Sequence, residues 1–194
     1  MKRVIAIAAV CLLIRGFSAA ADDGVLKDGV FSDADLGFRY TTPKSLVDET
    51  SDARESVRTR AAALHTHNTF NVLLSMTSGP DDTAPGWRLV SIETYLRSNF
   101  GGLNNAAAET KINLWAAGSH ASAVGDPKLV AIAGASFMVS NFEQSEPPLK
   151  KHAHVYSTIR NGQLLVIAFT ANSEEGVKSL DATMQTLQFG GVGK

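Results

Sequence analysis

The sequence predicts an α+β fold in which helices pack on the faces of a central antiparallel β-sheet. Three observations predict it. Short runs in which apolar residues alternate with polar ones recur along the chain, the pair Asn161-Gly162 joins two apolar strand-like runs, and the chain closes with an amphipathic stretch over residues 172–189. Strands joined by hairpins, with a few helices between them, are typical of the α+β class.

Residues 1–21 are predicted to form a cleaved secretory signal peptide. Lys2 and Arg3 precede an apolar run over residues 4–14, and small residues follow at positions 18–21. The run has about 11 residues, fewer than the roughly 20 that a membrane-spanning helix needs, so we expect no membrane span. A lipid anchor at Cys11 is the alternative, but Val10 stands where such signals need a small residue.

Residues 22–194 are predicted to form one exported domain, periplasmic or secreted. Cys11 is the only cysteine, so the domain would hold no disulfide and no thiolate ligand. Three of the 18 Lys and Arg residues lie in the signal, which leaves 15 against 19 acids, a net charge of −4. Nucleic acid is therefore not expected as a partner, because phosphate binding needs a basic patch. The sequence does not predict the oligomeric state.

The first half of the domain is predicted to hold a hairpin, a strand and two helices. Phe38 and Tyr40 alternate with polar neighbours, which is typical of a strand with one aromatic face on the core. Val57, Ala61 and Leu64 lie at helical spacing. In chain order we expect a hairpin over residues 29–41, a helix capped by Ser51 or Asp52, a central strand over residues 69–77, a loop over residues 79–87, and a helix over residues 91–102 that ends at Gly101-Gly102.

The second half is predicted to hold most of the sheet. Residues 109–115 fit a strand or a helix, and residues 118–125 fit a flexible loop. Two strands, residues 129–133 and 136–143, flank a turn or bulge at Gly134. Asn161-Gly162 suits a type I′ turn between two further strands, of which the second is apolar on both faces and should lie in the middle of the sheet. The closing helix would be capped by Asn172 or Ser173, with Val177, Leu180, Met184 and Leu187 as its apolar stripe.

The order of these parts resembles the PsbP-like fold. The residues that carry the resemblance are the hairpin ending GFRYTTP, the stretch LVAIAGASFMV and the closing helix that stops at TLQF, within Gly29 to Phe189. This family includes the PsbP subunit of photosystem II, a nuclear-transport factor that binds the GTPase Ran, and small exported bacterial proteins. The resemblance implies a non-catalytic accessory or binding protein, and it assigns no binding residue because a fold alone does not fix function.

Four of the five histidines form two pairs, His65-Thr66-His67 and His152-Ala153-His154. Residues two apart on a strand point to the same face, so each pair could offer two imidazoles to one metal ion. If both pairs met, His65, His67, His152 and His154 would form a zinc or copper site, with Glu143 and Glu146 as further possible ligands. Solvated histidines at the edges of strands are the alternative, in which case no cofactor is expected.

Catalytic motifs are not recognised in the sequence. Ser136 lacks the second glycine of G-x-S-x-G, Ser119-His120 lies in the uncertain loop, and the metalloprotease, P-loop and dinucleotide motifs do not occur. We therefore expect a protein that is not an enzyme. A hydrolase ranks behind the metal-binding alternative.

Trp87 and Trp115 are candidates for a partner surface, because tryptophans are enriched in binding hot spots. For Trp87, which follows a Pro-Gly turn, the alternative is a lid over the core. The loops over residues 79–87 and 118–127 are where a binding surface is expected. The sequence thus favours an exported, non-catalytic accessory or interaction protein of the cell envelope with a possible envelope protein partner.

Overall fold

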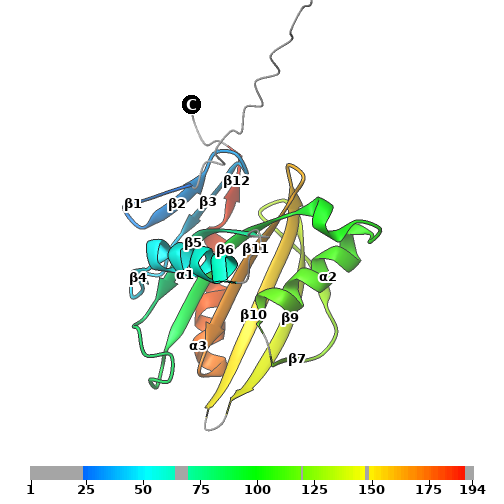
Figure 1. Cartoon of the computed structure of the whole chain (residues 1–194). Coiled ribbons are helices and arrows are strands. Elements are labelled where there is room, and N and C mark those ends of the chain that lie inside the picture. Colours follow the sequence, from blue (N-terminus) through cyan, green and yellow to red (C-terminus); the bar gives the residue numbers. More distant parts are fainter. Residues whose placement is uncertain (1–23, 64–69, 119, 147–148, 191–194) are drawn as a thin grey trace, which may run out of the picture.

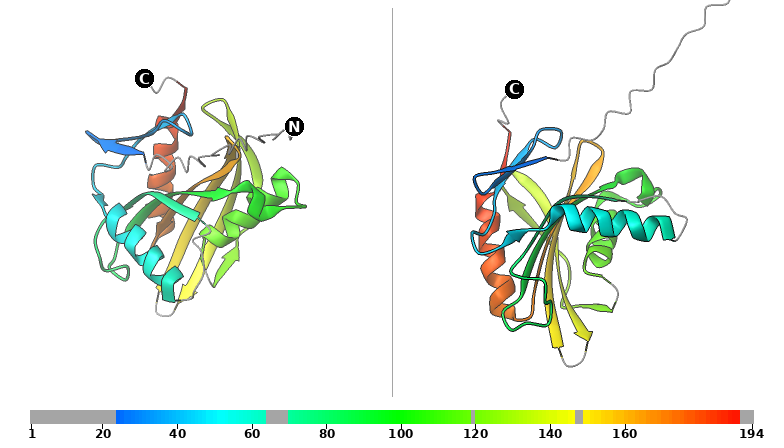
Figure 2. Two further views of the ribbon diagram at one scale, coloured as in Figure 1. Left: turned by 45° about the horizontal axis from the view of Figure 1, so that its top comes forward. Right: turned by 60° about the vertical axis from the view of Figure 1, so that its left-hand side comes forward.

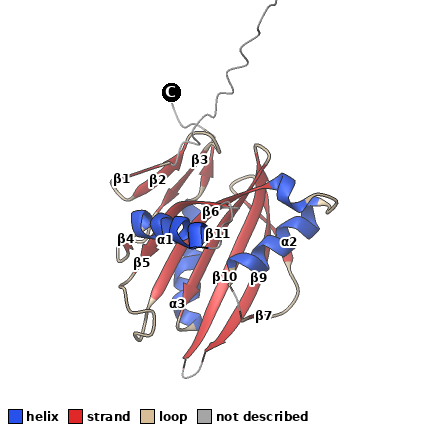
Figure 3. Ribbon diagram, in the orientation of Figure 1, coloured by secondary structure: helices blue, strands red, loops and turns tan. Residues whose placement is uncertain are grey.

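The computed structural model describes residues 24–63, 70–118, 120–146 and 149–190. Two antiparallel sheets form the framework, and three α-helices pack against them (Figures 1 and 3). The small sheet has the order β1-β2-β3-β12, formed by Val25–Lys27, Val30–Asp33, Phe38–Thr41 and Gln188–Phe189. The α+β class and the antiparallel sheet predicted from the sequence are confirmed.

The large sheet has the order β4-β5-β6-β11-β10-β9-β7, and β8 pairs with the same edge of β9 as β7. Its strands are β4 (Val47–Asp48), β5 (Phe70–Thr77), β6 (Arg88–Leu96), β7 (Ala121–Ala123), β8 (Lys128–Ile132), β9 (Ala135–Glu146), β10 (Leu149–Arg160) and β11 (Gln163–Ala171). Residues Asn161 and Gly162 have φ values of 47° and 77° between β10 and β11, as a type I′ turn requires. The strand β11 lies in the middle of the sheet and is buried on both faces, as predicted.

Two hydrophobic cores lie on the two faces of the large sheet. On one face, Phe38 and Tyr40 of the small sheet pack with α3 (Glu174–Asp181) and the 3-10 helix η2 (Ala182–Thr186). On the other face lies α2 (Asn105–Ala116), as the right-hand view of Figure 2 shows. The predicted apolar stripe of the closing helix is confirmed, since Val177, Leu180, Met184 and Leu187 are all buried.

The helix predicted over residues 91–102 is wrong. Residues 88–96 form β6, which pairs with β5 and with β11, and the 3-10 helix η1 (Arg97–Phe100) follows. Val90, Ile92 and Thr94 are buried on one face at a spacing of two. The spacing of Ile92 and Leu96 fits a helix turn as well, but pairing with β5 and β11 provides hydrogen-bond partners on both sides of the strand and decides for the sheet.

Residues 109–115, for which the sequence left strand and helix open, are helical and belong to α2 (Asn105–Ala116). Asn104 caps it by accepting a hydrogen bond from the backbone N–H of Ala107. The expected loop over residues 118–125 contains the short strand β7. None of the described helices is long and apolar enough to span a membrane.

The helix α1 (Thr50–Ala63) confirms a helix in this region but has no buried residue. Val57 and Ala61 of its expected apolar stripe are therefore not part of the core, and Leu64 lies outside the described residues. The helix α1 projects from the sheet on the same side as α2 (Figure 2). Arg54 anchors it, because the guanidinium donates hydrogen bonds to the carbonyl oxygens of Val72 and Leu73 on β5.

Candidate functional site

The predicted histidine pair on β10 lies on the face of the sheet that α3 covers. Nδ1 of His154 is 2.6 Å from Oδ2 of Asp181 on α3, and the hydroxyl of Tyr156 donates to Oδ1 of the same carboxylate at 2.9 Å. Burial raises the pKa of Tyr156 well above its usual value, and the neighbouring Asp181 carboxylate raises it further. This carboxylate therefore joins α3 to β10 through two side chains.

His152 has a carboxylate neighbour as well. It stands opposite Glu143 on β9, with 3.8 Å between Nδ1 and the nearer carboxylate oxygen, and Lys150 forms an ion pair with the same glutamate at 2.6 Å. Both histidines of β10 thus contact acidic side chains that help to hold neighbouring elements together.

The structure describes two of the four histidines of the predicted metal site, His152 and His154. His65 and His67 lie outside the described residues, and so does the side chain of Glu146. Within the described ranges, no three His, Cys, Asp or Glu side chains come together in a way that could hold a metal ion. A site that joins the two histidine pairs therefore stays a prediction.

The structure places Trp87 in the core and fastens the loop before it. Trp87 is only 9% exposed, and its Nε1 donates to the carbonyl oxygen of Gly79 at 3.0 Å. The ammonium of Lys151 lies 5.2 Å from the ring centroid and 2.5 Å from a carboxylate oxygen of Asp82. Asn172 donates to two carbonyl oxygens of the same loop. This arrangement is that of a lid over the core, which was the alternative for Trp87, and it leaves little of the residue exposed.

Trp115 has the opposite environment. It lies on α2 with half of its surface exposed, and its ring packs at 5.2 Å against that of Phe100. The ammonium of Lys111, one helical turn earlier, is 5.3 Å from the ring centroid. Leu114 beside it is exposed too. The ring is therefore held in place while part of it remains accessible.

A groove of about 650 Å³ runs between α2 and the segment over residues 123–127. Ala107 and Leu114 line it from the helix, and Pro127 and Phe142 line it from the sheet side. The helix is pinned beneath by Asn113, whose buried amide donates to the carbonyl oxygens of Met138 and Val155 and to the hydroxyl of Ser140. The groove lies where the sequence placed a binding loop.

The strand β8 is an exposed edge of the large sheet. Its residues from Lys128 to Ala131 are exposed, and in the described part of the chain its backbone pairs with β9 alone. Leu129 is 63% exposed and Val130 is 41% exposed, although neighbouring residues of a strand point to opposite faces. An apolar edge of this kind is a template for pairing with another strand.

Exposed apolar residues are concentrated in the part of the sequence that leads into β8. Of the eight exposed large hydrophobic residues in the described ranges, five lie between positions 114 and 130: Leu114, Trp115, Val124, Leu129 and Val130. This stretch thus holds most of the exposed large hydrophobic residues of the described chain, and exposed apolar surface is where interaction sites are expected.

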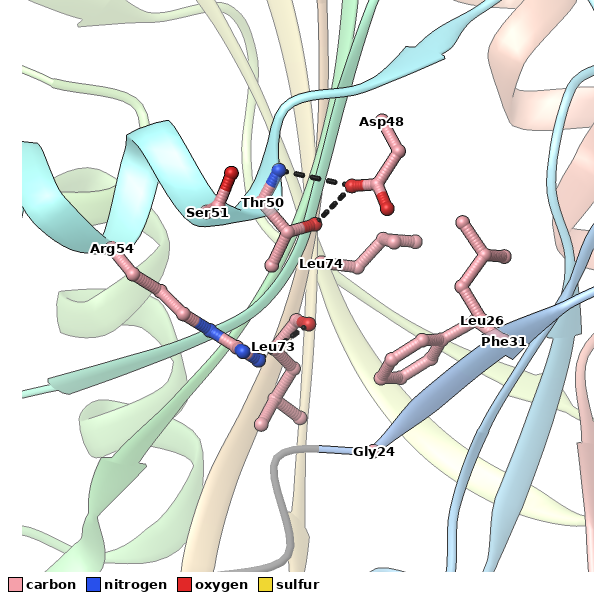
Figure 4. A pocket seen from close by; sticks show the side chains of 9 residues that line it. All are labelled: Gly24, Leu26, Phe31, Asp48, Thr50, Ser51, Arg54, Leu73 and Leu74. Carbon is pink, nitrogen blue, oxygen red and sulfur yellow. Dashed lines mark hydrogen bonds between the residues drawn. The ribbon is translucent and has the colours of Figure 1, made fainter.

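A second, polar pocket of about 280 Å³ lies where α1 begins, between the small and the large sheet (Figure 4). The backbone N–H and the hydroxyl of Thr50 both donate to Asp48, at 2.9 and 2.5 Å. Arg54 is bound to the carbonyl oxygens of β5, as described above. The polar groups of this pocket thus serve the start of α1, which favours a structural role.

Sequence reasoning found the loop that borders the groove and the strand β8, but it did not predict that β8 is an exposed edge of the sheet. The strand predicted over residues 129–133 is confirmed, but a short apolar run does not by itself distinguish a buried strand from an edge strand. The one available signal was Lys128 with Pro127 before it, since charges and proline are common at sheet edges.

No family model and no curated protein matches the chain. Among solved structures, it is similar to a protein of Bacteroides thetaiotaomicron, with 15% identity and a TM-score of 0.46 over 81% of this chain. The match covers 47% of the Bacteroides protein, so this chain spans about half of that protein's length.

Two further solved structures are similar. The cyanobacterial PsbP of Synechocystis has 11% identity and a TM-score of 0.45, over 82% of this chain and 91% of that one. LpqN of Mycobacterium tuberculosis, described as involved in cell envelope biogenesis, has 10% identity and a TM-score of 0.38, over 64% of this chain and 80% of LpqN. These likenesses concern the general arrangement of strands and helices, and they assign no partner or residue role to this chain.

Proposed function

We propose that this chain is an exported, non-catalytic interaction protein of the cell envelope, and that it binds a partner protein by accepting an extended segment of it at β8. The observation that carries the proposal is the exposure of Leu129 and Val130 on a strand whose outer edge is unpaired in the described structure. A segment that adds to this edge gains backbone hydrogen bonds, and apolar side chains on both faces gain contacts. Location in the envelope rests on the predicted signal over residues 1–21.

The chemistry of β8 indicates the kind of segment that fits. Its residues are Lys128, Leu129, Val130, Ala131 and Ile132, so the only charge is the lysine at its start. A partner strand with apolar residues and an acid opposite Lys128 would form an opposite-charge pair across the strands. A second copy paired antiparallel about Val130 would place Lys128 opposite Ile132. We therefore favour a different protein over a second copy.

The roles of the described polar side chains support a non-catalytic protein. Asp181 connects α3 to β10, Lys151 and Asp82 fasten the loop before Trp87, and Arg54 holds α1. Each of these charged groups has a partner on another element of the fold, which accounts for its presence without a reaction.

The test uses the full chain in its own envelope, with a photo-crosslinking side chain in place of Ala131, which is exposed on β8 and is kept in every variant compared. The proposal predicts one crosslinked partner protein, recovered in equal amount with the chain. The double variant Leu129→Lys/Val130→Lys should lose this partner, because lysines on an edge strand oppose pairing with another strand. Val47→Lys is the matched control, since Val47 is 62% exposed on β4 at the opposite edge of the same sheet.

Recovery of the partner at an unchanged level from the double variant would overturn the proposal. So would crosslinks between copies of the chain alone, because these would make β8 a dimer contact. Circular dichroism of the purified variants checks that the fold is retained, as expected for substitutions at exposed positions.

A further inference from the structure

The helix α2 has two different faces. Ala108, Ile112 and Asn113 are buried against the sheet. Ala107, Lys111 and Leu114, also at intervals of three to four residues, line the groove instead. The groove face is therefore a second, apolar stripe of the helix that no described segment covers.

The size of this groove suits a small molecule. Its volume of about 650 Å³ lies within the roughly 300–1,000 Å³ that ligand sites occupy. Small side chains at Ala106 and Ala107 keep the helix side of the groove open, and Phe142, which is buried in the core beneath, closes it. An elongated hydrocarbon chain fits a groove with walls of this kind, because such walls offer apolar surface and few hydrogen-bonding groups.

The charge at the groove indicates the head group of the ligand. Lys111 is the one charged residue among the described residues that line the groove, and no carboxylate does so. Its ammonium lies over the ring of Trp115, 5.3 Å from the centroid, which places a positive charge beside the apolar stripe. A ligand with a hydrocarbon chain and one negative charge complements this arrangement.

We propose that the groove binds a free fatty acid, with the hydrocarbon chain along Ala107 and Leu114 and the carboxylate at Lys111. This site is separate from the strand-docking edge. Val130 does not line the groove, and its partner residue on β9, Phe137, belongs to the core on the opposite face of the sheet.

The first test is a calorimetric titration of dodecanoic acid into the full chain. The second measures whether a brominated fatty acid quenches the fluorescence of Trp115 in a Trp87→Phe variant, where Trp115 is the remaining tryptophan. We expect saturable one-to-one binding with quenching of Trp115. Lys111→Met should weaken binding about tenfold or more, because a hydrogen bond to a charged group is lost. Lys111→Arg should restore most of the affinity, and Leu114→Glu should abolish binding.

Controls keep the outcome decisive. Lys128→Met removes an exposed lysine outside the groove and should leave the affinity unchanged. If Leu114→Glu does not fold, the comparison of Lys111→Met with Lys111→Arg still decides. Each of three results would overturn the proposal. The first is an equal loss of dodecanoic acid affinity in Lys111→Met and Lys128→Met, and the second is an affinity for dodecanol equal to that for dodecanoic acid. The third is binding to anionic vesicles without binding of the free acid. Val130→Lys should retain fatty-acid binding even if it loses the partner protein.

Discussion

His154 and Asp181 join the closing helix to the centre of the sheet, with 2.6 Å between Nδ1 of the histidine and Oδ2 of the aspartate. The two residues are 27 positions apart in the sequence. Tyr156 donates to the second oxygen of the same carboxylate, so one acid on α3 receives two side chains from β10. All three residues are partly buried, where hydrogen bonds contribute more than at a solvated surface.

Asp181→Ala should therefore destabilise the fold. It leaves Tyr156 and His154 without their shared acceptor in a partly buried place, which costs about 1–3 kcal/mol. Urea unfolding followed by circular dichroism measures the change. Lys178→Ala on the same helix is the control, since its ion pair with Glu174 is exposed and should leave the midpoint unchanged. Equal effects of the two variants would contradict a stabilising role for Asp181.

The three tyrosines should resist ionisation in the folded protein. Burial raises the pKa of Tyr40 to about 12 and raises the pKa values of Tyr95 and Tyr156 above that. At about pH 11 the native chain should show well under one tenth of the tyrosinate absorbance of the urea-unfolded chain, whose three tyrosines titrate near pH 10.

The same shifts set the direction of a pH effect on stability. Each folded-state pKa lies above the unfolded value, so the contribution of the neutral phenols is present below about pH 10 and is lost as the pH rises through the folded values. The urea midpoint should fall over this alkaline range. Tyrosinate absorbance that rises around pH 10 while circular dichroism is still native would contradict this prediction.

The parts of the fold that local sequence signals control were predictable. Asn161-Gly162 specifies its own turn, and the residues on either side then pair in the only register that this turn allows. Ser173 and the stripe from Val177 to Leu187 specify the closing helix in a similar way. Each of these signals lies within a few residues of the structure it produces.

The remaining parts depend on contacts between distant residues. Ile92 and Leu96 fit both a helix and a strand, and only pairing with β5 and β11 decides between them. The exposure of Val130 depends on the position of β8 at an edge, and the groove depends on where α2 packs relative to residues 123–127. The local sequence pattern does not determine the order of the strands in a sheet, so neither the exposed edge of β8 nor the groove beside α2 could be derived from it.

Lys151→Met should loosen the loop before Trp87. The substitution keeps an apolar stem of similar length but removes the ion pair with Asp82 and the cation–π contact, which together contribute about 1–3 kcal/mol. In a Trp115→Phe background, where Trp87 is the remaining fluorophore, acrylamide should quench the parent chain poorly and the Lys151→Met chain more strongly. Strong quenching in both chains would contradict the buried position of Trp87.

The histidines of β10 should not bind zinc or copper tightly by themselves. His152 and His154 supply two imidazoles, and a structural zinc site needs four ligands. Asp181 contacts Nδ1 of His154, which leaves Nε2 as the nitrogen that a metal would use. A tight site therefore requires His65 and His67 to lie nearby.

Calorimetric titration of Zn²⁺ and Cu²⁺ into the metal-stripped domain over residues 22–194 checks this prediction. We expect weak binding that the double variants His65→Ala/His67→Ala and His152→Ala/His154→Ala change little. Tight one-to-one binding that either double variant abolishes would contradict it. Such a result would join both pairs in one site and would make metal binding, instead of strand docking at β8, the leading function, because a four-histidine set has no role in pairing strands.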